Sequence, residues 1–179
     1  MRKNLLVVSL VALFVSFASA SFAEVGFQFR VPYQGTANDS ALKSGASGSS
    51  VLLTFDIDPS TTIGILSEQI NFTEKVGNAD VAGKYNVNAI RVIKTVVDPI
   101  YIGIDLGSAN FDGFAADPQA SLADVLGGVK LLSSKGKVTS FLNFELAYRF
   151  LKAPASPSVA NGNTDFGGAF VSLGAGVTF

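Results

Sequence analysis

The chain contains no histidine, no cysteine and no tryptophan among its 179 residues. Without cysteine it can form neither a disulfide nor a thiolate metal site, and without histidine it lacks the usual general base of hydrolases. Only 15% of the residues are charged, against roughly 25% in an average globular domain. The charges are nearly balanced, which leaves no basic patch for nucleic acid. These absences argue against an enzyme, a metal centre and a nucleic-acid-binding protein, and we expect no cofactor.

The first residues have the pattern of a secretory signal peptide. Arg2 and Lys3 precede an apolar run over residues 5–17, and the small residues that follow fit a signal-peptidase site. The run is shorter than the roughly 20 residues that a membrane-spanning helix needs. The sequence therefore predicts a cleaved signal peptide over residues 1–23 and one mature domain over residues 24–179, with 11 basic and 14 acidic residues.

Beyond the signal, apolar residues recur at every second position, which is typical of β-strands with two unlike faces. Two further segments are rich in β-branched residues, but polar and apolar residues occur on both faces of each strand. The sequence therefore does not fix their register. Each segment is near the roughly 9–11 residues of a tilted spanning strand. The regular segments are 25–33, 51–58, 100–107, 123–131, 137–150 and 168–179, and the irregular ones are 62–72 and 86–97.

The connections between these eight segments alternate in length. Short ones cover 59–61, 98–99 and 133–136, whereas long ones cover 34–50, 73–85, 108–121 and 151–167. A transmembrane up-and-down barrel has tight turns on one side and long loops on the other. In lipid an open sheet would leave unpaired edges, so the sheet has to close. The sequence thus predicts an all-β fold, an eight-stranded antiparallel up-and-down transmembrane β-barrel.

The lumen of an eight-stranded barrel is narrow enough to be filled by side chains. Enclosed charges are costly unless they are paired, so we expect an ion-paired interior with a structural role, with Arg30 near Asp56 and Arg149 near an acid. The same pairing makes a glycosidase-like use of Glu145 with Asp105 or Asp124 the weaker interpretation. The charged side chains expected to face inward are Arg30, Asp56, Asp105, Asp124, Lys130, Glu145 and Arg149.

Aromatic side chains near the strand ends are expected to form girdles at the two membrane interfaces. These are Tyr33, Phe72, Tyr148, Phe150 and Phe179.

The last eight residues alternate small or polar residues with apolar ones and end on an aromatic. Ser172, Gly174, Val177 and Phe179 carry this pattern. It resembles the closing-strand signal that the outer-membrane assembly machinery reads in Gram-negative β-barrels. With the signal peptide and the loop pattern, the chain resembles the small eight-stranded outer-membrane barrels of the OmpA transmembrane-domain and OmpX type. Because nothing follows Phe179, we expect no peptidoglycan-binding domain.

The resemblance implies an integral protein of the bacterial outer membrane with both termini in the periplasm. Its implied partners are outer-membrane lipid and lipopolysaccharide, the assembly machinery, and an extracellular partner bound through loops 34–50, 73–85, 108–121 and 151–167. Barrel enzymes of this compartment resemble one another in needing a histidine, which is absent. The function expected is therefore a non-enzymatic envelope structural or surface-interaction role.

Fold alone does not settle function, and two alternatives stay open. The first is a narrow channel or carrier for small solutes, hydrophobic ones included, similar to OmpW. Inward-facing Leu52, Leu126, Phe141 and Phe170 would support it. The second is a secreted soluble binding barrel similar to lipocalins. That alternative requires a polar outer wall, because soluble monomers avoid large exposed apolar patches.

Overall fold

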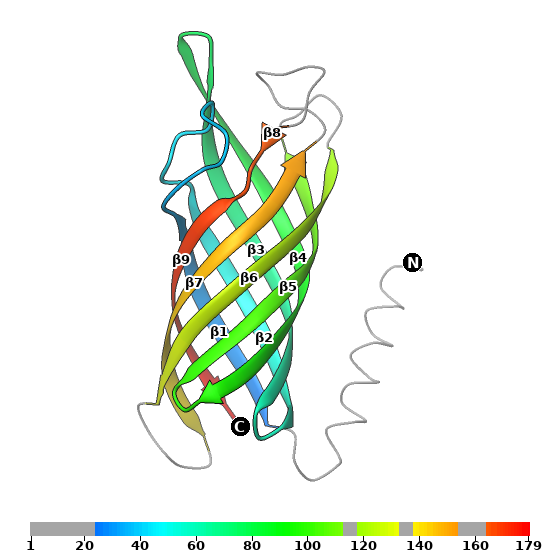
Figure 1. Cartoon of the computed structure of the whole chain (residues 1–179), viewed down its shortest axis with the longest axis vertical. Helices are drawn as coiled ribbons and strands as arrows, with labels where there is room; N and C mark the ends of the chain where they lie inside the picture. The colour runs from blue at the N-terminus through cyan, green and yellow to red at the C-terminus, as the bar shows by residue number, and fades with distance from the viewer. Residues whose placement is uncertain (1–23, 113–117, 133–137, 154–163) are drawn as a thin grey trace.

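The structure is a computed structural model that describes residues 24–112, 118–132, 138–153 and 164–179, so the expected signal peptide lies outside the described residues. Tilted strands form one tall barrel, with the C-terminus at its lower end in Figure 1. In the described part, no helix is long and apolar enough to span a membrane. The strands are β1 (Val25–Gln34), β2 (Ser47–Asp58), β3 (Thr61–Val76), β4 (Ala79–Val97), β5 (Ile100–Asp112), β6 (Gln119–Leu132), β7 (Thr139–Ala153), β8 (Thr164–Asp165) and β9 (Gly168–Thr178).

The sheet closes on itself. The eight long strands pair antiparallel in the order β6-β5-β4-β3-β2-β1-β9-β7, and an additional β6–β7 pairing joins the two ends. The two-residue strand β8 pairs only with the end of β7. Closure leaves no open edge, as a wall in hydrocarbon requires. The prediction of an eight-stranded antiparallel up-and-down barrel is confirmed.

The strands are staggered around the ring. A walk through hydrogen-bonded neighbours that leaves β3 at Thr61 returns to the same strand at Asn71, ten residues further along. This stagger and the tilt of the strands are linked in any closed barrel. The pairs are Thr61–Lys94, Lys94–Ile102, Ile102–Gly127, Gly127–Leu146, Leu146–Val171, Val171–Tyr33, Tyr33–Ser47 and Ser47–Asn71.

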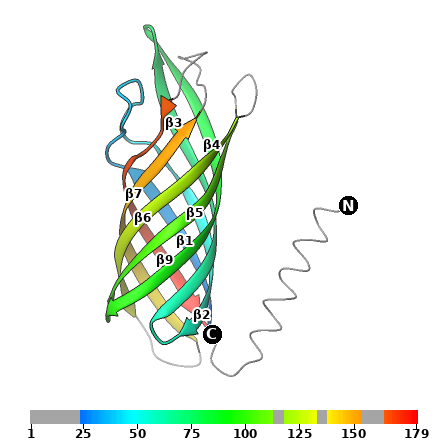
Figure 2. The ribbon, with the colours of Figure 1, turned by 45° about the vertical axis from the view of Figure 1, so that its right-hand side comes forward.

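The prediction of a long loop over residues 73–85 is wrong. Strand β3 continues to Val76 and β4 starts at Ala79, so only Gly77 and Asn78 turn the chain. Gly77 has a φ of 62°, which glycine adopts without the clash that a Cβ would cause. Gly-Asn is a two-residue hairpin signal that the sequence already carried. The resulting β3–β4 hairpin rises above the other strands in both views (Figures 1 and 2).

Other loops are also shorter than expected. In the region 108–121, β5 extends to Asp112 and β6 begins at Gln119, and in the region 34–50, β2 begins at Ser47. The segments 113–117, 133–137 and 154–163 lie outside the described residues. We call the end with the connections β1–β2, β3–β4, β5–β6 and β7–β9 the loop end, and the end with the connections 59–60 and 98–99 and the C-terminus the turn end.

The turn between β2 and β3 is held by its own side chains. Asp58 Oδ1 accepts a hydrogen bond from the Ser60 backbone N–H at 2.8 Å and one from the Ser60 hydroxyl at 2.7 Å. These bonds, led by the one from the hydroxyl, hold the pKa of the Asp58 carboxyl below its usual range. The carboxylate is thus the stable form at neutral pH, which suits a tight turn outside the membrane.

The outer wall is apolar, and this argues against the soluble alternative. Ile102, Phe144 and Leu173 are 54%, 41% and 62% exposed. Such side chains covering a monomer in water would be an aggregation hazard. Tyr33, Tyr148, Phe150 and Phe179 are also exposed, as the expected girdles require. Phe72 is the exception, because it lies on the inward face of β3.

A charge placed on the middle of this wall is expected to destabilise the barrel in lipid. Leu173→Arg is expected to lower the free energy of unfolding by about 2–4 kcal/mol, because arginine near the bilayer midplane loses its hydration. Urea unfolding of the protein folded into lipid vesicles measures this change. Gln69→Arg, at an exposed position beyond the apolar band on β3, is the matched control and is expected to change stability little. Equal effects of the two substitutions would contradict a lipid-facing Leu173.

Candidate functional site in the barrel lumen

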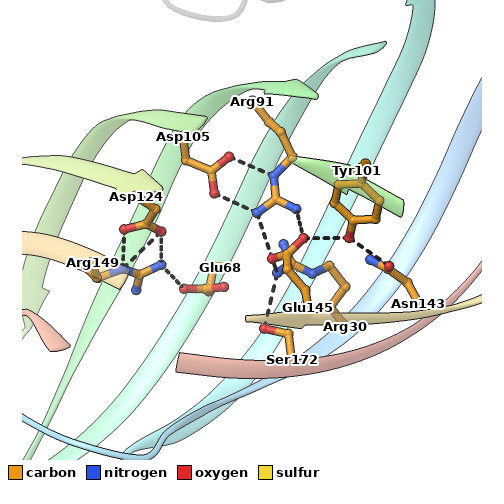
Figure 3. A network of polar contacts seen from close by, with 10 residues as sticks. All are labelled: Arg30, Glu68, Arg91, Tyr101, Asp105, Asp124, Asn143, Glu145, Arg149 and Ser172. Atoms are coloured by element: carbon orange, nitrogen blue, oxygen red, sulfur yellow. Dashed lines mark hydrogen bonds and ion pairs between the residues drawn. The ribbon is translucent and has the colours of Figure 1, made fainter. Parts of the chain in front are cut away.

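Inward-facing side chains divide the lumen into three levels. From the turn end these are an open vestibule, a layer of paired charges and a cluster of apolar and aromatic side chains. The order can be followed along β4, whose inward residues from the loop end are Tyr85, Val87, Ala89, Arg91 and Ile93. The ten polar residues of the charged layer and its border are drawn in Figure 3.

Arg91 is the centre of the first group of charges. Its Nε and Nη2 donate to the two carboxylate oxygens of Asp105 at 2.7 and 2.6 Å, and its Nη1 donates to Glu145 Oε2 at 2.7 Å. Glu145 also pairs with Arg30, and it accepts a hydrogen bond from the Tyr101 hydroxyl at 3.0 Å. Arg91 and Glu145 are buried, and so are their other ionic partners, Asp105 and Arg30. Planar guanidinium groups suit such bidentate contacts.

Arg149 is the centre of the second group (Figure 3). This group is nearer the loop end, because Arg149 follows Glu145 along β7, which runs toward that end. It donates to Asp124 from Nε at 3.0 Å and from Nη2 at 2.7 Å. Its Nη2 also lies 2.8 Å from Glu68 Oε1. On its other sides it contacts the Tyr85 hydroxyl and the face of the Phe170 ring. The two groups together hold three arginines and four acids, so nearly all of the enclosed charge is neutralised.

The expected pairing of Arg30 with Asp56 is wrong. Arg30 pairs with Glu145, and Asp56 instead accepts a hydrogen bond from the Thr62 hydroxyl nearer the turn end. Arg149 does lie beside an acid, as expected. The register explains the difference, because β1 and β7 both pair with β9. Ser172 of β9 lies opposite Glu145, and its side chain is too small to separate Glu145 from Arg30.

Two members of the charged layer were missed by the sequence reasoning. Arg91 and Glu68 lie on the strands whose register stayed open, and both face inward. A signal for Glu68 was present, because it shares the face of Leu66 and Ile70 on β3. Lys94, whose parity is opposite to that of Arg91, is exposed near the turn between β2 and β3 and donates to Ser60.

The vestibule occupies the turn end of the lumen. It has a volume of about 480 Å³, and Asp56 and Lys130, both expected to face inward, line it. The Lys130 ammonium lies 4.4 Å from the centroid of the Phe141 ring. Tyr101 and Asn143 border it on the side of the charged layer, joined by a hydrogen bond of 2.7 Å.

The loop-end level of the lumen is apolar. This differs from the ion-paired interior that we expected from the sequence. Phe111 packs against Phe166 and Tyr85 with ring centroids 4.7 and 5.2 Å away, and Phe72 contacts Phe166 at 4.9 Å. Leu42, from the connection between β1 and β2, belongs to the same buried hydrophobic cluster and is 7% exposed. We call Phe72, Tyr85, Phe111 and Phe166 the aromatic cluster.

The closing strand contributes small residues to the lumen. A Cβ on Gly174 would lie 2.3 Å from Gln28 Nε2, and one on Gly176 would lie 2.4 Å from the Phe141 ring. Ser172 Oγ accepts a hydrogen bond from Arg30 at 3.2 Å. Val177 pairs with Phe27 in the wall, and the Phe179 backbone N–H donates to Val25. Part of the pattern read as an assembly signal is therefore also required by packing inside the barrel.

The arrangement gives little basis for catalysis. The four carboxylates of the charged layer, those of Glu68, Asp105, Asp124 and Glu145, are each paired with an arginine. Within the described ranges, no group of three or more acidic side chains is placed to hold a metal ion.

Two solved structures show where this fold occurs. The outer membrane protein AlkL, determined by solid-state NMR in DMPC lipid bilayers, is similar with a TM-score of 0.52 at 12% identity, over 88% of this chain and 89% of that chain. The outer membrane protein OprG from Pseudomonas aeruginosa gives 0.49 at 9% identity, over 88% and 95%. No protein-family model and no curated protein matches the sequence. The likeness to AlkL shows the fold of a small outer-membrane β-barrel, and the finer resemblance to the OmpA and OmpX type stays a prediction.

Proposed function

We propose that the protein is a non-enzymatic outer-membrane barrel that is closed to solutes along its axis and acts as a structural or surface-interaction protein of the envelope. One observation carries this proposal: each of the eight wall strands places a buried polar side chain in the charged layer, and none of these is more than 4% exposed. They are Arg30, Ser50, Glu68, Arg91, Asp105, Asp124, Glu145, Arg149 and Ser172.

We place both termini and the turn end in the periplasm and the loop end outside the cell. The support is the asymmetry of the connections, because outer-membrane barrels have short periplasmic turns and longer external loops. The β3–β4 hairpin would then be the most prominent external element, and exposed polar residues such as Asn71 and Lys75 line its sides. Regions 34–50, 73–85, 108–121 and 151–167 would meet an extracellular partner or lipopolysaccharide, and β9 would meet the assembly machinery.

Conductance measurements test the closed lumen. Purified protein inserted into a planar lipid bilayer is expected to produce no discrete current steps, because ions would have to displace the paired charges around Arg91 and Arg149. A shift in gel mobility between unboiled and boiled samples confirms that the protein is folded. Reproducible single-channel steps from the folded protein would contradict the proposal.

The second candidate function is a carrier for apolar solutes, favoured by the aromatic cluster. Leu52, Leu126, Phe141 and Phe170 face inward, as that alternative requires. An apolar solute that displaced Leu42 and Phe166 would meet matching side chains, but the charged layer below would block its axial path.

Such a solute would need an exit through the wall. The pairing of β1 with β2 skips from Arg30–Ser50 to Tyr33–Ser47, and Pro32, which lies in between, has no N–H to donate. This interruption leaves a gap in the hydrogen-bond ladder close to Arg30 of the charged layer, and it is where a carrier would open.

A further inference from the structure

The vestibule at the turn end has the features of a built binding site. It is a cavity of about 480 Å³ that opens toward the turns and ends at the charged layer. The innermost lining side chains, Gln28, Leu52 and Asn143, are 4%, 1% and 7% exposed. A site of this form has one entrance and a polar inner end, and it has no part in the axial closure proposed above.

Gln28 supplies the observation that points to a ligand. Its side chain lines the vestibule, is almost fully buried, and its Nε2 has no hydrogen-bond partner. A buried donor without an acceptor costs about 1–3 kcal/mol. The amide packs over Gly174, since a Cβ there would lie 2.3 Å from Nε2. Because the Gln28 side chain lines the vestibule, a small rotation would turn this donor toward an oxygen acceptor placed there.

The remaining lining has the chemistry of a site for a neutral, polyhydroxylated molecule. Hydroxyl groups both donate and accept hydrogen bonds, and so do their usual partners, the hydroxyl and amide side chains. Five threonines surround the cavity, and the Phe141 ring contributes an apolar wall. The threonines are Thr54, Thr62, Thr95, Thr139 and Thr178.

The charges of the lining argue against an ionic ligand. Lys130 lies inside the vestibule over Phe141, whereas Asp56 lies on its wall and Glu24 and Asp98 also line it. A ligand of either sign would therefore meet a like charge as well as an opposite one. A neutral molecule avoids this conflict and still uses both kinds of group through hydrogen bonds.

We propose that the vestibule binds a short neutral saccharide, with the Gln28 amide donating to a ring or hydroxyl oxygen at the inner end and the threonine hydroxyls lining its sides. The volume suits one or two sugar units, in the range of about 300–1,000 Å³ found for small-molecule sites. On the closing strand, Gly174 and Gly176 leave room for the side chains of Gln28 and Phe141, which line the cavity.

Titration with the disaccharide of N-acetylglucosamine tests the proposal. The folded protein, held in lipid nanodiscs free of sugar-based detergent, is followed by two-dimensional NMR of its amides. Saturable shifts are expected for the Gln28 side-chain amide and for residues near Asn143, with none in the β3–β4 hairpin. If no signal of the vestibule moves at any soluble concentration, the cavity holds only water and the proposal is overturned.

Matched variants sharpen the result. Gln28→Leu removes the donor and is expected to weaken binding roughly three- to tenfold, the equivalent of one net hydrogen bond. Gln69→Leu, at an exposed position on β3, is expected to leave the affinity unchanged. Gel mobility before and after boiling shows that both variants fold. Equal affinity for Gln28→Leu and the parent protein would overturn the assignment of Gln28.

Charged probes test the class of ligand. Spermidine and N-acetylmuramic acid, a cation and an anion, are expected to shift the same signals at least tenfold more weakly than the neutral disaccharide. Tighter binding of either one would overturn the assignment to neutral saccharides. Because none of these readouts measures current, their outcome is independent of whether the barrel conducts.

Discussion

Replacing Glu145 with alanine is expected to lower the free energy of unfolding of the barrel by about 3–5 kcal/mol, since removing one member of a buried ion pair strands the other. Glu145 is fully buried and accepts from Arg30, Arg91 and Tyr101. In the variant, Arg91 keeps its ion pair with Asp105, whereas Arg30 keeps only its hydrogen bond to the Ser172 hydroxyl. Urea unfolding in lipid vesicles, followed by gel mobility, measures the loss.

The matched control removes an exposed ion pair of the same kind. Asp80 pairs with Lys43 at the loop end, where both side chains are about half exposed. Asp80→Ala is expected to change stability by no more than about 1 kcal/mol, because water screens and replaces such contacts. If Glu145→Ala proved as mild as Asp80→Ala, the charged layer would not be the structural centre of the lumen.

Replacing Phe111 with alanine is expected to destabilise the barrel by about 3–5 kcal/mol, the range for truncation of a fully buried aromatic side chain. Phe111 is 0% exposed and packs between Tyr85 and Phe166. The cavity left behind would be lined by apolar groups and would stay dry. Urea unfolding measures the loss of stability, and xenon binding followed by NMR detects the cavity.

Phe150→Ala is the control for this prediction. Phe150 is 55% exposed on the outer wall, where lipid can fill the space that its ring leaves. Its truncation is expected to destabilise the barrel much less than that of Phe111. If the Phe111→Ala barrel kept the stability of the parent, the aromatic cluster would be a loosely filled chamber, and the carrier function would gain support over a closed structural barrel.

Much of the wall could be predicted from the sequence because lipid imposes a simple rule. Outward positions have to be apolar, so segments such as 100–107 and 137–150 alternate with little exception. The inward orientation of Asp105, Asp124, Glu145 and Arg149 followed from the same parity. The β3–β4 hairpin was missed because its residues beyond the membrane face water on their outer side, so the apolar alternation that marks a spanning strand ends there.

The partners inside the lumen were not predictable in the same way. Arg30 and Glu145 are 115 residues apart in the chain, and they meet only because β9 inserts between β1 and β7. Phe72 shows the same limit. Its position near a strand end suggested an interface girdle, but the extension of β3 to Val76 keeps Phe72 inside the barrel, on the face of Leu66 and Ile70.

The order of residues by itself determined the strand period, the antiparallel connectivity and which face of most strands meets lipid, because those properties depend on neighbours one or two positions apart. Only the closed ring, with its stagger of ten residues, decided which charges pair, where the aromatic cluster forms and that a vestibule remains at the turn end. Those contacts depend on the relative heights of eight strands, which no local pattern specifies.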